Sequence, residues 1–178
     1  QPRHDHRHRI EHCSILRPDL IDRIARLGAV PIPGTSFLHD FRAVYLSGLG
    51  LERLRYAYAL RTFLDRGIVA AASSDTPVCS PNALLGIQTM VTRKDADGQV
   101  TWPEECITLE EAIRVYTVNG AYASFSEHEK GTIEPGKLAD LAVLEADLRT
   151  VPPDALGQVR VDYTIVDGRI AYARPGAA

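Results

Sequence analysis

Four histidines lie close together near the start of the chain, in the stretch HDHRHRIEHC. An imidazole can bind a metal ion or exchange a proton near neutral pH. If the following HRIEHCSI forms a strand, His8 and His12 lie about 13 Å apart along it. Side chains that far apart cannot bind one zinc ion, whose bonds to imidazole are about 2.0–2.1 Å long. We therefore expect His12, at the carboxyl end of the strand, to carry chemistry. We expect His4, His6 and His8 to form an approach or scaffold segment.

A second polar strand end follows 63 positions after His12, where the small apolar run IVAAASSD closes with Asp75. In isolation Asp75 is typical of a turn or helix cap. The spacing is close to two strand–helix–strand steps of about 30 residues each, which would bring both side chains to one edge of a sheet. A histidine and an aspartate there can be metal ligands, or a base and its electrostatic partner.

Strands and helices alternate in the pattern that must position these side chains. Pro18 suits a first helical turn and Gly28 a helix end, and Thr108 with Glu111 forms a capping box. A run of small apolar residues before Asp75 is typical of a strand that is covered on both faces. The pattern predicts strands at 8–15, 29–35 and 68–75, and helices at 17–28, 51–67, 82–92 and 108–125. It indicates an α/β fold with a parallel sheet.

The pattern changes after residue 130. Short strands with glycine-rich turns follow, one of the turns at Asp167-Gly168. This region is expected to form a small, separate β layer.

Composition narrows the function classes. The chain has 178 residues, 45% of them hydrophobic and 24% charged, with a net charge of -3. It shows no basic patch for nucleic acid and no apolar run near the roughly 20 residues that cross a membrane. Three widely spaced cysteines, Cys13, Cys79 and Cys106, argue against a disulfide framework and favour a reducing, cytoplasmic setting. A thiol enzyme using Cys13 or Cys79 is disfavoured, since Cys13 and His12 point to opposite strand faces. We expect both cysteines to be buried and structural.

Several motifs resemble one known family in their order along nearly the whole chain. These are HRIEHCS, SSDTPV with PNALLGIQTMVTR, ITLEEAIRVYT, KGTIEPGKLADLAVLEAD and TIVDGRIAY. Together they resemble the C-terminal portion of the metal-dependent amidohydrolases, closest to the amidohydrolase-3, N-substituted formamide deformylase-like branch.

The resemblance implies a partial (β/α)8 TIM barrel, made of strands six to eight with their helices, plus a small C-terminal β-sandwich part. Residues 1–128 would be the barrel part and residues 129–178 the β-sandwich segment. A complete barrel takes roughly 250 residues. The chain therefore resembles a fragment, which we expect to be poorly stable alone, to aggregate, to form a homo-oligomer or to associate with the missing N-terminal part.

The resemblance also implies roles for three residues. His12 and Asp75 match metal ligands, and Asp75 matches the general base. His39, in PGTSFLHDF, matches a loop that contacts substrate, although a loop histidine is often merely exposed. The cofactor is then a divalent metal, with zinc preferred and iron, manganese or nickel also suited to such ligands. One or two ions are expected in the complete protein.

The family's H-x-H motif, bridging lysine or glutamate, and a further histidine have no match here. A catalytic zinc usually has three protein ligands, so the fragment alone is expected to be inactive. The leading hypothesis is a metal-dependent hydrolase of non-peptide C–N bonds, acting on a small amide or formamide-type substrate. The alternative is a non-catalytic α/β remnant that serves as a binding or assembly module.

Overall fold

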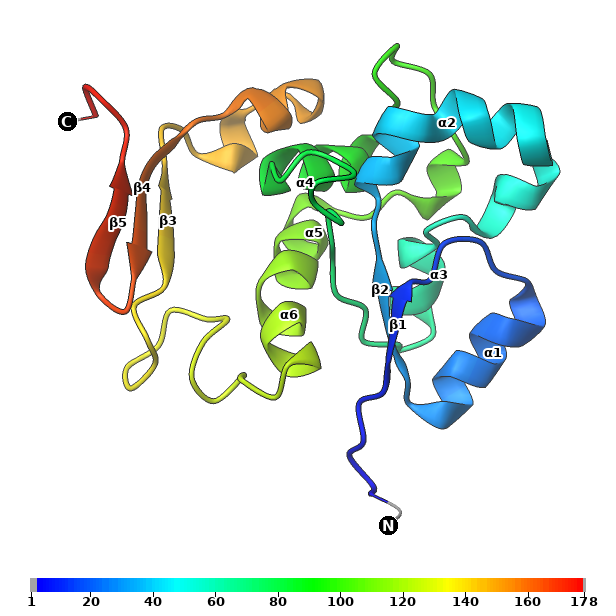
Figure 1. The fold of residues 1–178 in the computed structure, drawn as a ribbon, viewed down its shortest axis with the longest axis horizontal. Helices are drawn as coiled ribbons and strands as arrows, with labels where there is room; N and C mark the ends of the chain where they lie inside the picture. The colour runs from blue at the N-terminus through cyan, green and yellow to red at the C-terminus, as the bar shows by residue number, and fades with distance from the viewer. Residues whose placement is uncertain (1–2, 178) are drawn as a thin grey trace.

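The computed structural model describes residues 3–177. Residues 1–2 of the predicted barrel part and residue 178 of the predicted β-sandwich segment lie outside the described residues. An α/β part comes first along the chain, and an antiparallel sheet follows at the C-terminal end (Figure 1).

Six α-helices and four short 3-10 helices occur among the described residues. They are α1 Pro18–Leu27, α2 Ser36–Leu49, η1 Glu52–Tyr56, α3 Leu60–Asp65, α4 Ala83–Thr92, η2 Pro103–Glu105, α5 Leu109–Tyr116, α6 Val118–Ala123, η3 Leu148–Thr150 and η4 Pro153–Gln158. The local signals at their ends are confirmed. Gly28 ends α1 in the left-handed conformation, and the capping box of Thr108 and Glu111 begins α5.

Two parallel strands lie at the centre of the α/β part. β1 (Arg9–His12) pairs with β2 (Val30–Pro33), with Arg9 opposite Val30 and His12 opposite Pro33. All four residues of β2 are buried and all four of β1 are exposed. The third expected strand, 68–75, is not a regular strand. It runs beside β2, where the amide of Ala71 donates to the carbonyl of Pro31 at 3.1 Å.

The main core lies between these segments and the helices. α1, α3, α4 and α5 turn their apolar faces inward, and the start of the 68–75 segment packs among them. Its most deeply buried side chains are Ile21, Leu60, Phe63, Ala70, Met90, Ala112 and Val115. The side chain of Asn119 in α6 donates to the carbonyl of Ala70 at 2.8 Å. One carbonyl of the irregular segment is thereby satisfied without a regular strand partner.

The helix predicted at 51–67 is wrong as a single element. It divides into η1 and α3, and between them Tyr58 has a φ of 50°. The cause is long-range hydrogen bonding. The buried guanidinium of Arg93 donates to the carbonyls of Ala57 and Tyr58, and the amide of Tyr58 donates to the carbonyl of Ser14. A buried charge needs such hydrogen-bond acceptors. Here the acceptors are two backbone carbonyls within the stretch that was predicted to be one helix.

Two other helical predictions also need correction. The loop expected around His39 is instead the first part of α2, in which the amide of Leu38 donates to the carbonyl of Thr35. The single helix expected at 108–125 is broken at Thr117, whose φ and ψ of -114° and -83° are not helical. The helix predicted at 82–92 is confirmed as α4, which begins at an Asn82 cap.

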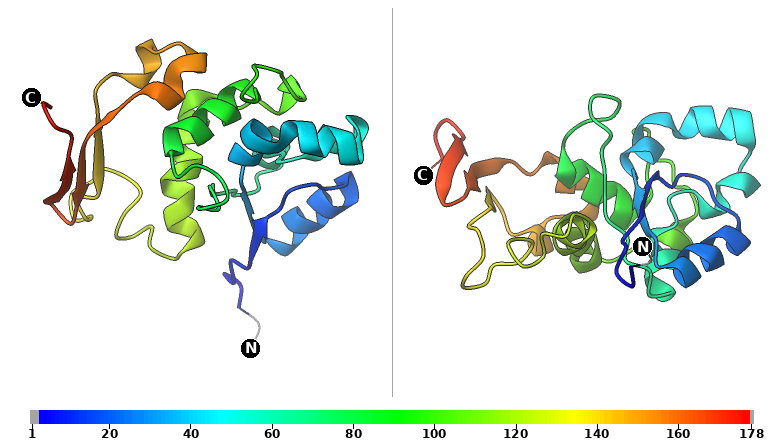
Figure 2. Two further views of the ribbon diagram at one scale, coloured as in Figure 1. Left: turned by 45° about the horizontal axis from the view of Figure 1, so that its top comes forward. Right: turned by 60° about the horizontal axis from the view of Figure 1, so that its bottom comes forward.

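The C-terminal part forms one antiparallel sheet of β3 (Leu141–Leu144), β4 (Val161–Val166) and β5 (Arg169–Ala173), in that order. The expected turn is confirmed, since Asp167 and Gly168 both have positive φ, as a tight type I′ hairpin requires. The sheet stands apart from the helices in all three ribbon views (Figures 1 and 2). A second antiparallel sheet does not occur among residues 3–177, so the β-sandwich stays a prediction. The predicted boundary at 128/129 falls between α6 and β3 and also stays a prediction.

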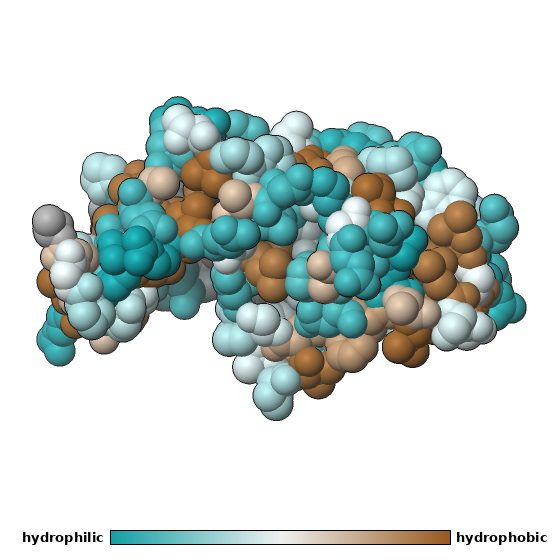
Figure 3. All heavy atoms as spheres, turned by 90° about the horizontal axis from the view of Figure 1, so that it is seen from above, coloured by the Kyte–Doolittle hydropathy of each residue, from teal (hydrophilic) through white to brown (hydrophobic). Residues whose placement is uncertain are grey.

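The surface mixes polar and apolar side chains. Figure 3 shows brown apolar patches among the polar residues on the face seen from above. Large exposed side chains include Ile133, Ile170 and Tyr172 in the C-terminal part. In the part of the chain that the structure describes, no helix is both long and apolar enough to cross a membrane.

Candidate metal centre

The structure brings His12 and Asp75 together. His12 ends β1, Asp75 ends the 68–75 segment, and β2 lies between these two stretches through its bonds to each. The Nδ1 atom of His12 lies 3.9 Å from the Oδ2 atom of Asp75. Their side chains are 51% and 39% exposed, so an ion from solvent can reach both.

A small cavity of about 130 Å³ opens beside the two side chains. Glu11 and Ser73 add polar groups to it, and its other walls are Ile32, Gly34 and Phe37. The hydroxyl of Ser73 accepts a hydrogen bond of 3.1 Å from the amide of Asp75. This contact helps to fix the turn that presents the Asp75 carboxylate.

Both candidate ligands have unusual backbone conformations. His12 has a φ of 61° and Asp75 a φ of 56°, in the left-handed region that residues other than glycine rarely adopt. Cys13, directly after His12, has a φ of 40°. Such conformations cost free energy, and they cluster at active sites and ligand sites. Two of them meeting at one cavity favours a functional site over two unrelated turns.

The distance between the two donors suits a zinc ion. Zinc bonds to a histidine nitrogen and to a carboxylate oxygen together measure about 4.0–4.3 Å, so donors 3.9 Å apart can contact one ion. Both donor types suit a divalent metal. No group of three or more histidine, cysteine, aspartate or glutamate side chains suited to a metal occurs within residues 3–177. The site therefore fits a metal with two ligands from the described residues.

The thiols near the site are not activated. Burial raises the pKa of Cys13 to about 11. Burial, with a hydrogen bond to Asp40, raises the pKa of Cys79 to about 12. Both side chains are buried, as expected. A thiol nucleophile needs a lowered pKa, so the geometry argues against a cysteine enzyme.

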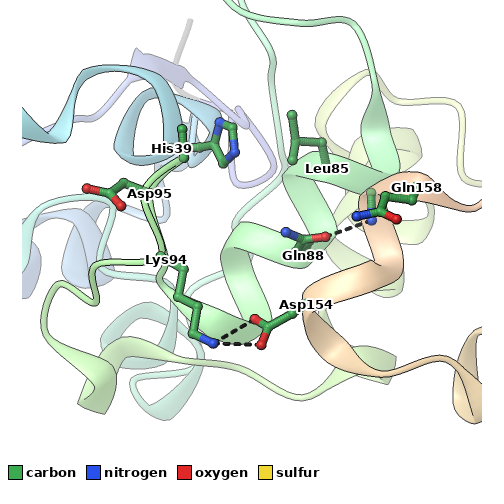
Figure 4. A pocket seen from close by; sticks show the side chains of 10 residues that line it. His39, Leu85, Gln88, Lys94, Asp95, Asp154 and Gln158 are labelled. Atoms are coloured by element: carbon green, nitrogen blue, oxygen red, sulfur yellow. Dashed lines mark hydrogen bonds and ion pairs between the residues drawn. The ribbon is translucent and has the colours of Figure 1, made fainter.

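His39 lies apart from this cavity. Its Nδ1 atom is 2.7 Å from the carboxylate of Asp40, and its side chain is 20% exposed. It lines a different pocket of about 420 Å³ with Gln88, Lys94 and Gln158, among others (Figure 4). The structure thus brings His12 and Asp75 together but does not place His39 with them. Its contact with substrate stays a prediction.

His6 and His8 have structural contacts. The Nδ1 atom of His6 accepts from the amide of His8 at 3.1 Å, so its Nε2–H donates to the carbonyl of Leu27 at 2.7 Å. The two rings stack at 4.6 Å between their centroids. His6 therefore ties the segment before β1 to the end of α1.

Sequence reasoning missed Phe37 and Tyr58. Phe37 lines the cavity edge-on to His12, and Tyr58 stacks behind Phe37. The four-residue spacing of Phe37 and Phe41 is a signal for one helix face, once that stretch is seen to be helical. We find no comparable local signal for Tyr58, because its conformation depends on the distant residues Ser14 and Arg93.

The α/β fold is that of a family of hydrolases. The chain belongs to the Amidohydrolase family, whose sequence model matches residues 1–172. The resemblance seen in the motifs is thereby confirmed.

Two relatives are similar over almost all of the chain. One is the Bacillus subtilis (strain 168) protein named as an amidohydrolase, YtcJ, with 34% identity over 176 residues, covering 97% of this chain and 32% of YtcJ. The other is the N-substituted formamide deformylase of Arthrobacter pascens, with 34% identity over 171 residues, covering 95% of this chain and 31% of that enzyme. The chain thus spans about a third of the length of these relatives.

A solved structure shows the same likeness. The crystal structure of an uncharacterized metal-dependent hydrolase from Pyrococcus furiosus superposes with a TM-score of 0.61 and 28% identity. The match covers 72% of this chain and 26% of that hydrolase. The α/β fold predicted from the sequence is thereby confirmed, and the family supports a divalent metal.

Proposed function

We propose that the chain is part of a metal-dependent hydrolase of non-peptide C–N bonds, with a small amide or formamide-type substrate. One observation carries the proposal: His12 and Asp75, 63 positions apart, end the segments on either side of β2 with their side-chain atoms 3.9 Å apart. Family membership supports the reaction class. The relative named as an N-substituted formamide deformylase supports the substrate class.

In this proposal His12 and Asp75 hold a divalent ion, for which zinc is our choice. Such an ion polarises a carbonyl group and makes water acidic enough to ionise near neutral pH. The Asp75 carboxylate takes the proton of the attacking water and delivers it to the departing amine. Ser73, through its bond to the Asp75 amide, holds the carboxylate in place for both transfers. His39 would contact a more distant portion of the substrate.

The proposal extends to the architecture. We infer that β1, β2 and the 68–75 segment correspond to strands six to eight of a (β/α)8 barrel, and that β3–β5 belong to a small β-sandwich. A catalytic zinc usually has three protein ligands, and this chain contributes two, His12 and Asp75, in this proposal. The chain spans about a third of the length of its relatives. We infer that it corresponds to their C-terminal portion and that the remaining ligands come from the rest of the complete protein. The spaced, unpaired cysteines fit a cytoplasmic setting.

Zinc binding and hydrolysis test the proposal together. We expect Asp75→Asn and His12→Ala to weaken Zn²⁺ binding by about 10-fold or more, as loss of one of two protein ligands should. In the complete enzyme, Asp75→Asn should also abolish formamide or amide hydrolysis. His39→Ala serves as the matched control, because it removes an imidazole outside the cavity and should leave Zn²⁺ affinity unchanged. Unchanged affinity in both site variants would contradict the assignment.

A second candidate is a non-catalytic binding or assembly module. It is favoured by the exposure of all four residues of β1 and all five of β5, since open strand edges can pair with another chain. Homo-oligomers and association with a longer partner chain both belong to this candidate. A wild-type protein that binds no Zn²⁺, hydrolyses no amide and forms a defined complex would favour it.

A further inference from the structure

Phe37 lies directly against one candidate ligand. Its ring is edge-on to the imidazole of His12, with 6.0 Å between centroids and 74° between planes. This is within the range at which aromatic rings attract one another in an edge-to-face arrangement. Phe37 also lines the same cavity as His12 and Asp75.

The Phe37 ring is fixed from behind. It stacks on Tyr58 at 6.1 Å with only 20° between the planes, and it contacts Phe41 at 5.6 Å. Gly34 leaves the space that the ring occupies, since a Cβ there would lie 3.0 Å from Phe37 Cδ2 and 3.3 Å from the carbonyl of Ser73. The ring therefore has little room to turn away from His12.

Tyr58 is in turn one of the largest fully buried side chains among the described residues. It is 1% exposed, and its hydroxyl lies 2.9 Å from the hydroxyl of Tyr45. Its amide donates to the carbonyl of Ser14 at 2.8 Å, and its carbonyl accepts from Arg93 at 3.2 Å. Because Ser14 is two residues after His12, Tyr58 both supports the Phe37 ring and fixes the backbone next to His12.

His12 needs such support. Its side chain is half exposed, and 3.9 Å to Asp75 is too long for a hydrogen bond. A metal-binding histidine is usually oriented by a hydrogen bond to its second nitrogen. Within residues 3–177 no hydrogen bond to the His12 imidazole is present, so packing must orient the ring. We propose that Phe37, held by Tyr58, is the positioning residue that aims the His12 imidazole toward Asp75.

This inference rests on the proposed metal site, and the test separates the two. We would measure Zn²⁺ affinity of the full chain by competition with a chelator. We would also measure the χ1 averaging of His12 and its contacts with the residue 37 side chain by NMR, in the metal-free protein. Phe37→Leu should weaken Zn²⁺ binding about tenfold, the lower range for losing a group that orients a ligand. It should also let His12 χ1 average over several rotamers.

Matched variants exclude a merely structural effect. Phe37→Tyr keeps the ring and should restore both readouts. Phe63→Leu makes the same change in α3, in a different buried cluster from Phe37 and outside the cavity, and should leave both unchanged. Thermal unfolding of each variant reports whether the fold is retained.

Two results would overturn the inference. The first is a Phe37→Leu protein whose His12 rotamer and Zn²⁺ affinity match those of the wild type. The second needs no variant: a wild-type His12 side chain that already averages over rotamers, with no contact to Phe37. If His12→Ala leaves Zn²⁺ affinity unchanged while Phe37→Leu frees the His12 ring, the proposed function fails and the positioning role stands.

Discussion

The α/β part and the C-terminal sheet are stabilised in different ways. In the α/β part, Arg93 is 1% exposed and joins stretches of chain that are 36 positions apart. In the sheet, β4 and β5 are joined by a tight turn, and all five residues of β5 are exposed. The ion pair of Arg160 with Glu145 lies at the surface. The candidate site depends on the first kind of order, because its supports are buried and distant in sequence.

The two parts meet at both apolar and polar contacts. Leu156 in η4 is buried in the main core, and Leu144 and Leu148 pack against that core. The amide of Gly157 in η4 donates to Gln88 in α4, and the side chain of Asn82 donates to the carbonyl of Gly157. Lys94 forms an ion pair with Asp154, as Figure 4 shows. The sheet is thus attached beside α4, and changes within it should leave the candidate site undisturbed.

Arg93→Met should give the largest effect. The methionine would leave the carbonyls of Ala57, Tyr58 and Thr101 without their donor, so we expect a loss of about 3–5 kcal/mol in the free energy of unfolding. Urea denaturation followed by circular dichroism measures it. Arg160→Met, in the sheet, is the matched control and should cost about 1 kcal/mol or less. Equal losses would remove the distinction between the two parts.

Replacing one glycine in each part by alanine should distinguish further how the α/β part and the C-terminal sheet are stabilised. A Cβ on Gly86 in α4 would overlap the Tyr116 hydroxyl, so Gly86→Ala should cost about 1–3 kcal/mol through overpacking. Gly168 in the β4–β5 turn meets nothing within 4 Å but has a φ of 73°, so Gly168→Ala should cost about 1–2 kcal/mol through backbone strain. Urea unfolding of Gly86→Ala and of Gly168→Ala, each combined with Tyr116→Phe, tests whether the two losses of stability have different causes. Tyr116→Phe should partly rescue Gly86→Ala alone, because it removes the hydroxyl that the added Cβ would overlap but leaves the ring carbon 2.8 Å away.

Acid should give the smallest effect. Arg7 donates to Glu127 and lowers the pKa of that carboxyl to about 2. A carboxyl whose folded pKa is lowered stabilises the fold above its unfolded value near 4.5, and that stability is lost as the pH falls toward 2. Glu127→Gln should therefore flatten the pH dependence of the urea midpoint between about pH 4.5 and 2.

Glu145 in the sheet is the corresponding control. The amide and side chain of Arg160 lower its pKa as well, so Glu145→Gln should flatten the same window, but less. A larger change from Glu145→Gln than from Glu127→Gln would reverse the expected order of the two parts.

What could be predicted from the sequence was local. The Thr108 and Glu111 capping box, the Gly28 helix end and the Asp167-Gly168 turn each depend on residues within a few positions, and all three are present. The break at Tyr58 was missed because its cause, Arg93, lies 35 positions away. The candidate site is different, because two of its residues were predicted from their long-range spacing.

Spacing along a parallel sheet placed His12 and Asp75 at one edge, and the structure brings them to 3.9 Å. Their role as ligands stays a prediction. Phe37 was missed because its stretch was expected to be a loop, and a loop offers no helix face along which to pair residues. His39 was grouped with the site through a resemblance, and the geometry gives it a separate pocket.

The left-handed conformation of Tyr58 has a consequence for folding. Its bonds to Ser14 and Arg93 close loops of 44 and 35 residues, and such closures are slow because chain entropy is lost before the contacts form. The helices α1, α4 and α5, with their local end signals, can form earlier. We therefore expect the stacking of Phe37 on Tyr58, and with it the ordering of His12, to be among the last steps on the pathway to the native chain.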